Sequence, residues 1–389
     1  MLVIENANVV LEDRIMRGGT VIVEGDRIAG LSKRCVPHDW GNAERFDARG
    51  LYVGPGFVDI HVHGGGGHMF YSEPGKAAEH FLRHGETTVL ATLYYDLTKE
   101  RFLDAIGRVK AAMAVQDGGP IRGFYMEGPY MNPAYGASPE KNCWKGVIRP
   151  EDYAGIVDLA GDLAKVWAVA PERDGVEDFV KYAKKVNPGA RIAVGHSEAT
   201  PEQIRRLREY GLSIATHCMD ATGSRSEWVG TRGCGPDEAC MLDDDMYAEL
   251  ICDSLGVHVC QDLIKLLIKV KGFSKVMLIT DSFVSGEAPP DRLKDVPDLS
   301  FDAAGNLSGS RLTMDIACRN LVRHTGCTME QAFLMASGNP ARAIGMYGEI
   351  GSIAEGKRAD FVICNEMFDV KHVVMSGRFI TRREDDDNA

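Results

Sequence analysis

The chain has 389 residues, and its 44 lysines and arginines against 56 aspartates and glutamates give a formal net charge of −12. Hydrophobic residues make up 44% and charged residues 26%, which is the composition of an ordinary globular protein. Binding to nucleic acid or to an anionic membrane surface is not expected, because both need a basic surface. No apolar run approaches the roughly 18–20 residues that cross a bilayer.

Both ends of the chain have the pattern of short β-strands. In residues 2–32, apolar and polar residues alternate in three segments, and Gly25-Asp26 suits a tight turn. Residues 358–380 repeat this pattern around a second turn at Ser376-Gly377. We therefore expect one small β-sandwich domain built from both termini, residues 1–54 and 346–384, with an acidic tail over residues 385–389.

Between these ends, eight short apolar runs alternate with helical patterns. The runs are residues 57–63, 87–93, 121–127, 166–172, 191–196, 213–217, 247–253 and 275–281. Amphipathic segments such as 98–115, 175–186 and 261–272 lie between them, and Thr200 and Gln203 form a capping-box pattern before another. Eight strands, each followed by a crossover of sufficient length, predict an α/β fold: a catalytic (β/α)₈ TIM-type barrel over residues 55–345.

Polar side chains occur at the ends of these runs, where a strand buried on both faces would stay apolar. They are His61 and His63, Glu127, His196, His217, Asp253 and Asp281. Because the carboxyl ends of barrel strands meet at one mouth, we expect these side chains to converge where barrel enzymes carry their active sites. Imidazole and carboxylate together favour a divalent ion, zinc first, with iron or manganese as alternatives.

Each of these positions also has a plainer interpretation. His61 and His63, two residues apart on a strand, share one face and can share one metal, but they could also be surface imidazoles on a loop. Either His196 or His217 alone could be a buried core residue. Asp281 is suited to take a proton from water and return it to a leaving amine, although Asp-Ser after a strand also caps helices. Their joint occurrence favours a metal-dependent hydrolase.

Several motifs resemble those of the N-acetylglucosamine-6-phosphate deacetylases, a family of the metal-dependent amidohydrolase superfamily. They are PGFVDIHVHG, EGPY, VAPE, GHSEAT, LSGSRLTMD, ASGNPARAIG and GSIAEGKRADFVI, and they extend over nearly the whole chain. The resemblance implies one or two metal ions at the mouth of the barrel. His61 and His63 would bind one ion, and Glu127, His196 and His217 the other, with Glu127 near both. Asp281 would be the catalytic acid and base.

Four departures from the family pattern affect the substrate-binding loops. Ser138 stands where a substrate-holding histidine is usual, and Asp220 replaces an amide. Arg232 is the best match to the family's phosphate-binding arginine, but it could also be a surface residue, and residues are inserted before its loop. His258, a candidate to stabilise the oxyanion, follows Asp253 at a longer spacing than is usual. All four residues are candidate substrate contacts.

The expected reaction is therefore hydrolysis of an N-acetylamino sugar phosphate, foremost N-acetylglucosamine 6-phosphate, to glucosamine 6-phosphate and acetate. The alternative is a related amidohydrolase acting on another N-acyl amino sugar, an N-acyl amino acid or a cyclic amide. A scaffold without activity is disfavoured, because the six metal and acid/base candidates are all present. The resemblance suggests a homodimer. Ten cysteines without a C-x-x-C motif, and a start without a secretory pattern, favour reduced thiols and the cytoplasm.

Overall fold

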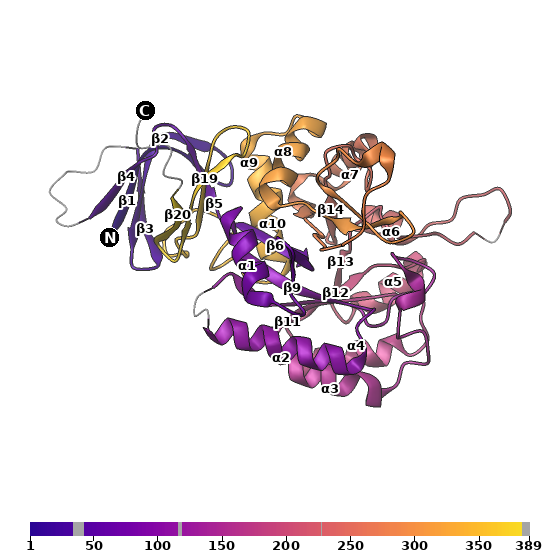
Figure 1. The fold of residues 1–389 in the computed structure, drawn as a ribbon. Coiled ribbons are helices and arrows are strands. Elements are labelled where there is room, and N and C mark those ends of the chain that lie inside the picture. The colour runs from indigo at the N-terminus through magenta and orange to yellow at the C-terminus, as the bar shows by residue number, and fades with distance from the viewer. Residues whose placement is uncertain (34–42, 116–118, 227, 383–389) are drawn as a thin grey trace.

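The computed structural model describes residues 1–33, 43–115, 119–226 and 228–382. The predicted acidic tail at 385–389 and Cys35 lie outside the described residues. Figure 1 shows two parts, a terminal β domain at one side and a larger α/β part. Within the described parts, the cysteines are free thiols, and no helix is long and apolar enough to cross a membrane.

Eight parallel strands form the predicted barrel, in the order in which they occur along the chain. They are β6 (Phe57–Val62), β9 (Glu86–Tyr94), β10 (Ile121–Glu127), β11 (Ala164–Val169), β12 (Arg191–Val194), β13 (Leu212–Ala215), β14 (Tyr247–Ile251) and β15 (Val276–Ile279). The barrel closes just beyond β15. There the amide of Asp281 donates to the carbonyl of His61 at 2.9 Å, and the amide of His63 donates to that of Ser282 at 2.9 Å. The sequence-based prediction of a (β/α)₈ barrel is confirmed.

Helices cover the outside of this barrel (Figure 1). They are α1 (Pro74–Arg83), α2 (Lys99–Val115), α3 (Pro150–Ala160), α4 (Val176–Val186), α5 (Pro201–Arg208), α6 (Pro236–Leu242), α7 (Gln261–Lys271), α8 (Met314–Thr325), α9 (Met329–Phe333) and α10 (Asn339–Ala343). Helix α4 illustrates why they form, because Val176, Phe179, Val180 and Ala183 recur at helical spacing and are its buried residues. Thr200 and Gln203 make the predicted capping box at the start of α5.

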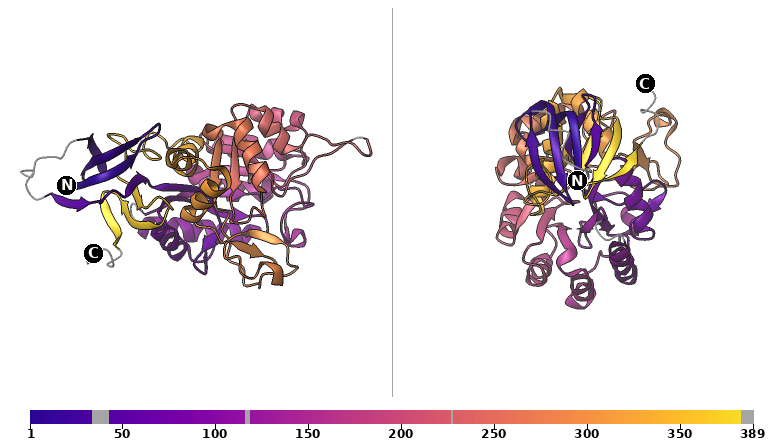
Figure 2. Two further views of the ribbon diagram at one scale, coloured as in Figure 1. Left: turned by 90° about the horizontal axis from the view of Figure 1, so that it is seen from above. Right: turned by 90° about the vertical axis from the view of Figure 1, so that its left-hand side faces the viewer.

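Strands from both chain ends form a separate sheet, as predicted. They are β1 (Leu2–Val10), β2 (Ile15–Glu24), β3 (Arg27–Ser32), β4 (Glu44–Asp47), β5 (Tyr52–Pro55), β18 (Phe361–Cys364), β19 (Val370–Met375) and β20 (Arg378–Arg382). The two ends meet where β5 pairs antiparallel with β18, with Val53 opposite Ile363. Figure 2 shows these early and late segments side by side. The residue limits given above for the domains stay a prediction.

Two small hairpins complete the fold near the mouth of the barrel. Strands β7 (Gly64–Gly65) and β8 (His68–Met69) follow β6, and β16 (Leu299–Phe301) pairs with β17 (Leu307–Ser310) after β15. The second hairpin is tied to the barrel, because the amide of Ser310 donates to the carbonyl of Asp281 at 2.8 Å. It thereby forms part of the wall above the strand ends.

Candidate metal centre and substrate pocket

The carboxyl ends of the barrel strands bring the predicted ligands together, and all of them are buried. His61 belongs to β6 and Glu127 is the last residue of β10, whereas His196, His217 and Asp281 each lie two residues beyond a strand. These last three have φ angles of 45°, 28° and 47°. Residues other than glycine seldom adopt this region, which costs of the order of 1–3 kcal/mol, and such strain clusters at functional sites. These backbone conformations direct the side chains of His196, His217 and Asp281 toward the cluster.

Glu127 lies at the centre of the cluster. Its Oε1 is 2.7 Å from Nε2 of His196 and 3.3 Å from Nε2 of His217, and its Oε2 is 3.3 Å from Nε2 of His63. The Nε2 atoms of His196 and His217 are themselves 3.1 Å apart. Two groups of side chains each have ligand atoms that all lie within 4.8 Å of one another. One group is His61, His63 and Glu127, and the other is Glu127, His196 and His217. The two predicted ligand sets are therefore adjacent and share one carboxylate.

The imidazoles at the ends of this cluster are held by the nitrogen that faces away from it. Nδ1 of His217 lies 3.1 Å from the carbonyl oxygen of Asp220, and Nδ1 of His61 lies 3.0 Å from Oε2 of Glu249.

The nitrogen of His61 that faces the cluster is unsatisfied. This atom, Nε2, is buried without a hydrogen-bond partner among the described residues. A buried polar atom left unsatisfied is costly unless something binds it. This nitrogen fits a cation, because the acidic oxygens of Glu127 and Asp281 lie 3.7 and 3.6 Å from it.

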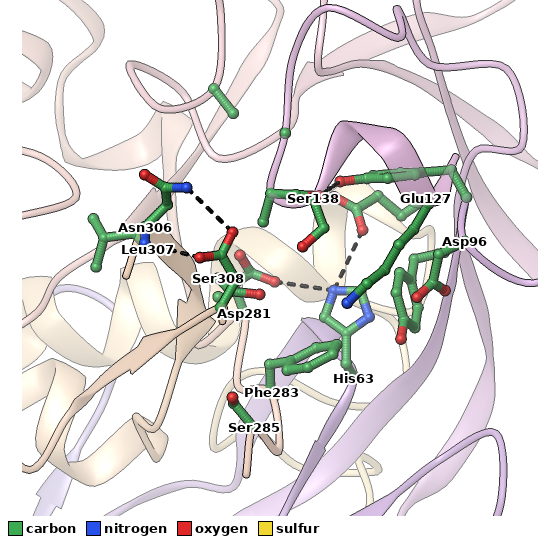
Figure 3. Close-up of a pocket in the computed structure, with 18 of the residues that line it drawn as sticks. His63, Asp96, Glu127, Ser138, Asp281, Phe283, Ser285, Asn306, Leu307 and Ser308 are labelled. Carbon is green, nitrogen blue, oxygen red and sulfur yellow. Dashed lines mark hydrogen bonds and ion pairs between the residues drawn. The ribbon is translucent and has the colours of Figure 1, made fainter. Parts of the chain in front are cut away.

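Asp281 is a buried carboxylate at the edge of the cluster, and its Oδ1 is 3.0 Å from Nε2 of His63 (Figure 3). Burial alone would raise the pKa of Asp281, but the hydrogen bond from His63 lowers it below the ordinary value. Burial would likewise lower the pKa of His63, but Asp281 and Glu127 raise it to about 10. Asp281 is thus favoured as an ionised carboxylate. It caps no described helix, since the next one begins at residue 291.

A pocket of about 490 Å³ opens above this cluster. Three of the four predicted substrate contacts, Ser138, Asp220 and His258, line it together with four of the five metal candidates, His63, Glu127, His196 and His217. Nδ1 of His258 is 3.1 Å from Oδ2 of Asp253, and its Nε2 is 3.1 Å from the carbonyl oxygen of Gly309. Burial would lower the pKa of His258, but its contact with Asp253 raises it. The ring is therefore favoured as a cation with protons on both nitrogens.

Arg232 is not among the residues that line the pocket of its own chain. It lies on a loop between β13 and α6 that projects from the barrel (Figure 1), and its side chain is 82% exposed beside Glu238. Trp228 and Val229 on the same loop are exposed as well. Within the described parts of the chain, the one lysine or arginine that lines the pocket is Lys141.

Sequence reasoning missed several residues of the site. Glu249 lies behind His61, and its position inside the apolar run YAELICD was a usable signal, because a buried carboxylate needs a partner. Asp96, Lys141, Glu287 and Asp302 line the outer pocket. They lie on loops outside the recognised motifs, and nothing in their spacing indicated that these loops meet.

Comparison with known proteins identifies the family. The model of the amidohydrolase family matches residues 52–380. The chain belongs to the amidohydrolase family. This amidohydrolase is 31% identical to the N-acetylgalactosamine-6-phosphate deacetylase of Escherichia coli O157:H7, over 83% of this chain and 86% of the relative. It is 27% identical to the N-acetylglucosamine-6-phosphate deacetylase of Haemophilus influenzae, over 94% of this chain and 95% of the relative.

Solved structures agree with this assignment. The crystal structure of N-acetylglucosamine-6-phosphate deacetylase from Pasteurella multocida has a TM-score of 0.85 and 26% identity, with 98% of this chain and 100% of that chain covered. A mutant of the Mycobacterium smegmatis enzyme in complex with N-acetyl-D-glucosamine 6-phosphate has a TM-score of 0.81 and 26% identity, covering 98% and 99%. This amidohydrolase is accordingly a hydrolase of amide carbon–nitrogen bonds.

Proposed function

We propose that this amidohydrolase is a metal-dependent deacetylase that hydrolyses N-acetylglucosamine 6-phosphate to glucosamine 6-phosphate and acetate. The observation that carries the proposal is the pair of ligand groups that share Glu127 directly beside the carboxylate of Asp281. The names of the relatives support the substrate class, an N-acetylated amino sugar 6-phosphate. They differ in the sugar, which the experiment below addresses.

Divalent zinc is the proposed cofactor, with iron or manganese as alternatives, because imidazole and carboxylate are its ordinary ligands. Glu127, His196 and His217 would hold one ion, and His61 and His63 with Glu127 would hold a second. When bound, the ion supplies Lewis acidity, which makes water acidic enough to attack near neutral pH.

Asp281 is the proposed acid and base. Its carboxylate takes a proton from the attacking water as that water adds to the acetamide carbon, and it returns the proton to the nitrogen of the sugar. The carbon–nitrogen bond then breaks, the nitrogen leaves as a neutral amine, and the acetic acid formed passes its proton to that amine, so acetate and the ammonium form of the sugar are released. The depressed pKa of Asp281 suits the first step, because the group must be ionised before it can accept a proton.

His258 is the proposed donor to the oxygen that becomes negative during attack, with its Nε2–H turning from the carbonyl oxygen of Gly309 to that oxygen. Its protonated ring, held by Asp253, lines the pocket. A charged donor in a buried site stabilises such an oxyanion. Ser138, Asp220 and Lys141 border the space above it and are proposed to contact the sugar and its phosphate.

The charge of the outer pocket favours a second candidate, a deacylase of an unphosphorylated N-acyl amino sugar or N-acyl amino acid. Four carboxylates line that part of the pocket, Asp96, Asp220, Glu287 and Asp302, against the single cation of Lys141. A phosphate dianion would be repelled by this wall unless a further cation reaches it.

A homodimer could supply that cation. The apolar side chains of Leu263, Leu266 and Val270 are exposed along α7, which supports a protein interface. In a dimer, the projecting loop would carry Arg232 toward a neighbouring pocket. We propose a cytoplasmic location, which the free thiols of the described cysteines support. Light scattering coupled to size-exclusion chromatography tests the dimer, and a monomeric mass would contradict it.

A substrate panel tests the function. Zinc-loaded enzyme is assayed for acetate release from N-acetylglucosamine 6-phosphate, its galactosamine isomer and both unphosphorylated sugars. The proposal predicts the highest kcat/KM for the phosphorylated glucosamine. Preference for the isomer would change the sugar only. Activity that ignores the phosphate would support the second candidate, and zinc-loaded enzyme inactive on all four sugars would refute the proposed function.

A further inference from the structure

A carboxylate that none of the proposed chemical steps uses lies directly behind the metal centre. Glu249 is in the middle of β14, between Ala248 and Leu250, and its side chain is fully buried. An ionised carboxylate placed in an apolar interior is very costly unless it is paired or hydrogen-bonded. The contacts of Glu249 therefore indicate what it does.

Those contacts join the two groups of metal candidates. Oε2 of Glu249 lies 3.0 Å from Nδ1 of His61 and 3.2 Å from the backbone nitrogen of His217. The ring of Tyr125 stacks on His61, with 4.4 Å between ring centroids. Stacking on Tyr125 thus fixes the plane of the His61 ring, and the contact with Glu249 fixes its Nδ1 edge.

This contact decides which nitrogen of His61 is left for a metal. A carboxylate accepts hydrogen bonds, so Nδ1 of His61 carries the proton and the lone pair is on Nε2. Nε2 has no hydrogen-bond partner among the described residues and faces Oε1 of Glu127 at 3.7 Å and Oδ1 of Asp281 at 3.6 Å. Without Glu249, the ring could carry its proton on Nε2 or rotate away.

The two ligand groups differ in the partner of their outward-facing histidine nitrogen. The outward nitrogen of His217 meets a neutral backbone carbonyl, that of Asp220, whereas the outward nitrogen of His61 meets a charged carboxylate. A carboxylate partner makes an imidazole a stronger ligand and orients it. It also adds a negative charge: two divalent ions would face Glu127, Asp281 and Glu249, so the repulsion between the ions is better compensated.

We infer that Glu249 is a positioning residue that presents Nε2 of His61 and thereby determines whether the group of His61, His63 and Glu127 holds a second divalent ion. The inference rests on the proposed metal-dependent function. It does not depend on which substrate the enzyme uses, since metal binding is measured without substrate.

Zinc titration of the metal-free protein tests it. The wild type, Glu249→Gln and Glu86→Gln are titrated against a competing chelator, and bound zinc is counted by mass spectrometry after dialysis. Glu86 is the matched control, because it is fully buried on β9 and accepts from the amide of Met314 at 2.7 Å, and within the described parts of the chain it makes no hydrogen bond to a histidine. We expect Glu249→Gln to weaken one of two zinc equivalents about 10- to 100-fold and to leave the other unchanged. Glu86→Gln should bind zinc like the wild type.

The result that overturns the inference is a folded Glu249→Gln protein that holds as much zinc as the wild type at the same free zinc concentration. A wild type that binds no zinc would instead remove the proposed metal-dependent function itself. Circular dichroism verifies the fold of each variant. Should Glu249→Gln not fold, nitrogen-15 NMR of the histidine rings in the metal-free wild type decides, with His61 assigned through a His61→Gln variant. A proton on Nδ1 of His61 supports the inference, and a proton on Nε2 overturns it.

Discussion

The floor and the wall of the pocket are built differently. The floor consists of strand ends, where Glu127, His196 and His217 are 4%, 6% and 2% exposed and each hydrogen-bonds to another member of the cluster. The wall consists of loops, residues 136–141, 220–221, 283–287 and 302–309, that approach from separate places in the chain. We propose that this difference separates two tasks: the buried floor carries the chemistry, and the loops determine which acyl amine reaches it.

The strongest test of this division compares an acid of the floor with an acid of the wall. Asp281→Asn should lower kcat by about 10²- to 10⁴-fold, because it removes the group that accepts and returns the proton. Bound zinc, counted by mass spectrometry, should not change. Asp302→Asn, which alters a carboxylate of the wall, should keep kcat close to that of the wild type. Retained turnover in Asp281→Asn would sink the assignment of the acid and base.

The next test concerns the residue that joins floor and wall. His258 is proposed to act as a cation, and Asp253 raises its pKa against the lowering effect of burial. Asp253→Asn removes that charge, so the pKa of His258 should fall. The ring then loses its proton at a lower pH, and the alkaline limb of the kcat/KM profile should move to lower pH. An alkaline limb that stays in place would show that His258 does not set it.

A smaller effect is expected from the single cation of the wall. Lys141→Met should raise KM for the phosphorylated sugar by roughly 2- to 10-fold, because a partly solvated charge contact is lost. The kcat should not change, and KM for the unphosphorylated sugar should stay the same. Equal effects on both sugars would mean that Lys141 does not contact the phosphate.

The smallest effect is expected from removing one acid of the wall. Asp220→Asn should lower KM for the phosphorylated sugar by roughly 2- to 5-fold, since one repulsive charge near the phosphate disappears. Steady-state kinetics at two salt concentrations measures this, because added salt screens the repulsion and should shrink the difference. A higher KM in the variant would instead indicate that the contact of Asp220 with the sugar outweighs its repulsion of the phosphate.

The sequence predicts the floor well for a physical reason. Strands of a barrel end at one mouth, so a polar residue such as Glu127 or His217 at the end of an apolar run already has a location in space. The eight predicted runs all overlap strands of the barrel. The terminal sheet was predictable in the same way, from alternation and turn residues.

The wall was not predictable in this way, because the position of a loop depends on contacts that periodicity does not encode. Ser138, Asp220 and His258 were found through family motifs, and the structure brings them to the pocket. Arg232 was chosen by the same motif argument, yet it lies on a projecting loop outside the pocket of its own chain. Glu249 was accessible from its place in an apolar strand, but its partner was not.

The pairing of β5 with β18 also has a consequence for folding during synthesis on the ribosome. The first strands emerge early, but the strand that completes their sheet lies about 300 residues later, between Pro55 and Phe361. At about 5–20 residues per second, translation leaves the edge of β5 open for roughly 15–60 s. A newly made chain therefore exposes this sheet edge to chaperones throughout synthesis of its barrel. A truncated mRNA whose coding region ends before residue 361 yields a protein in which the edge of β5 is never covered by β18.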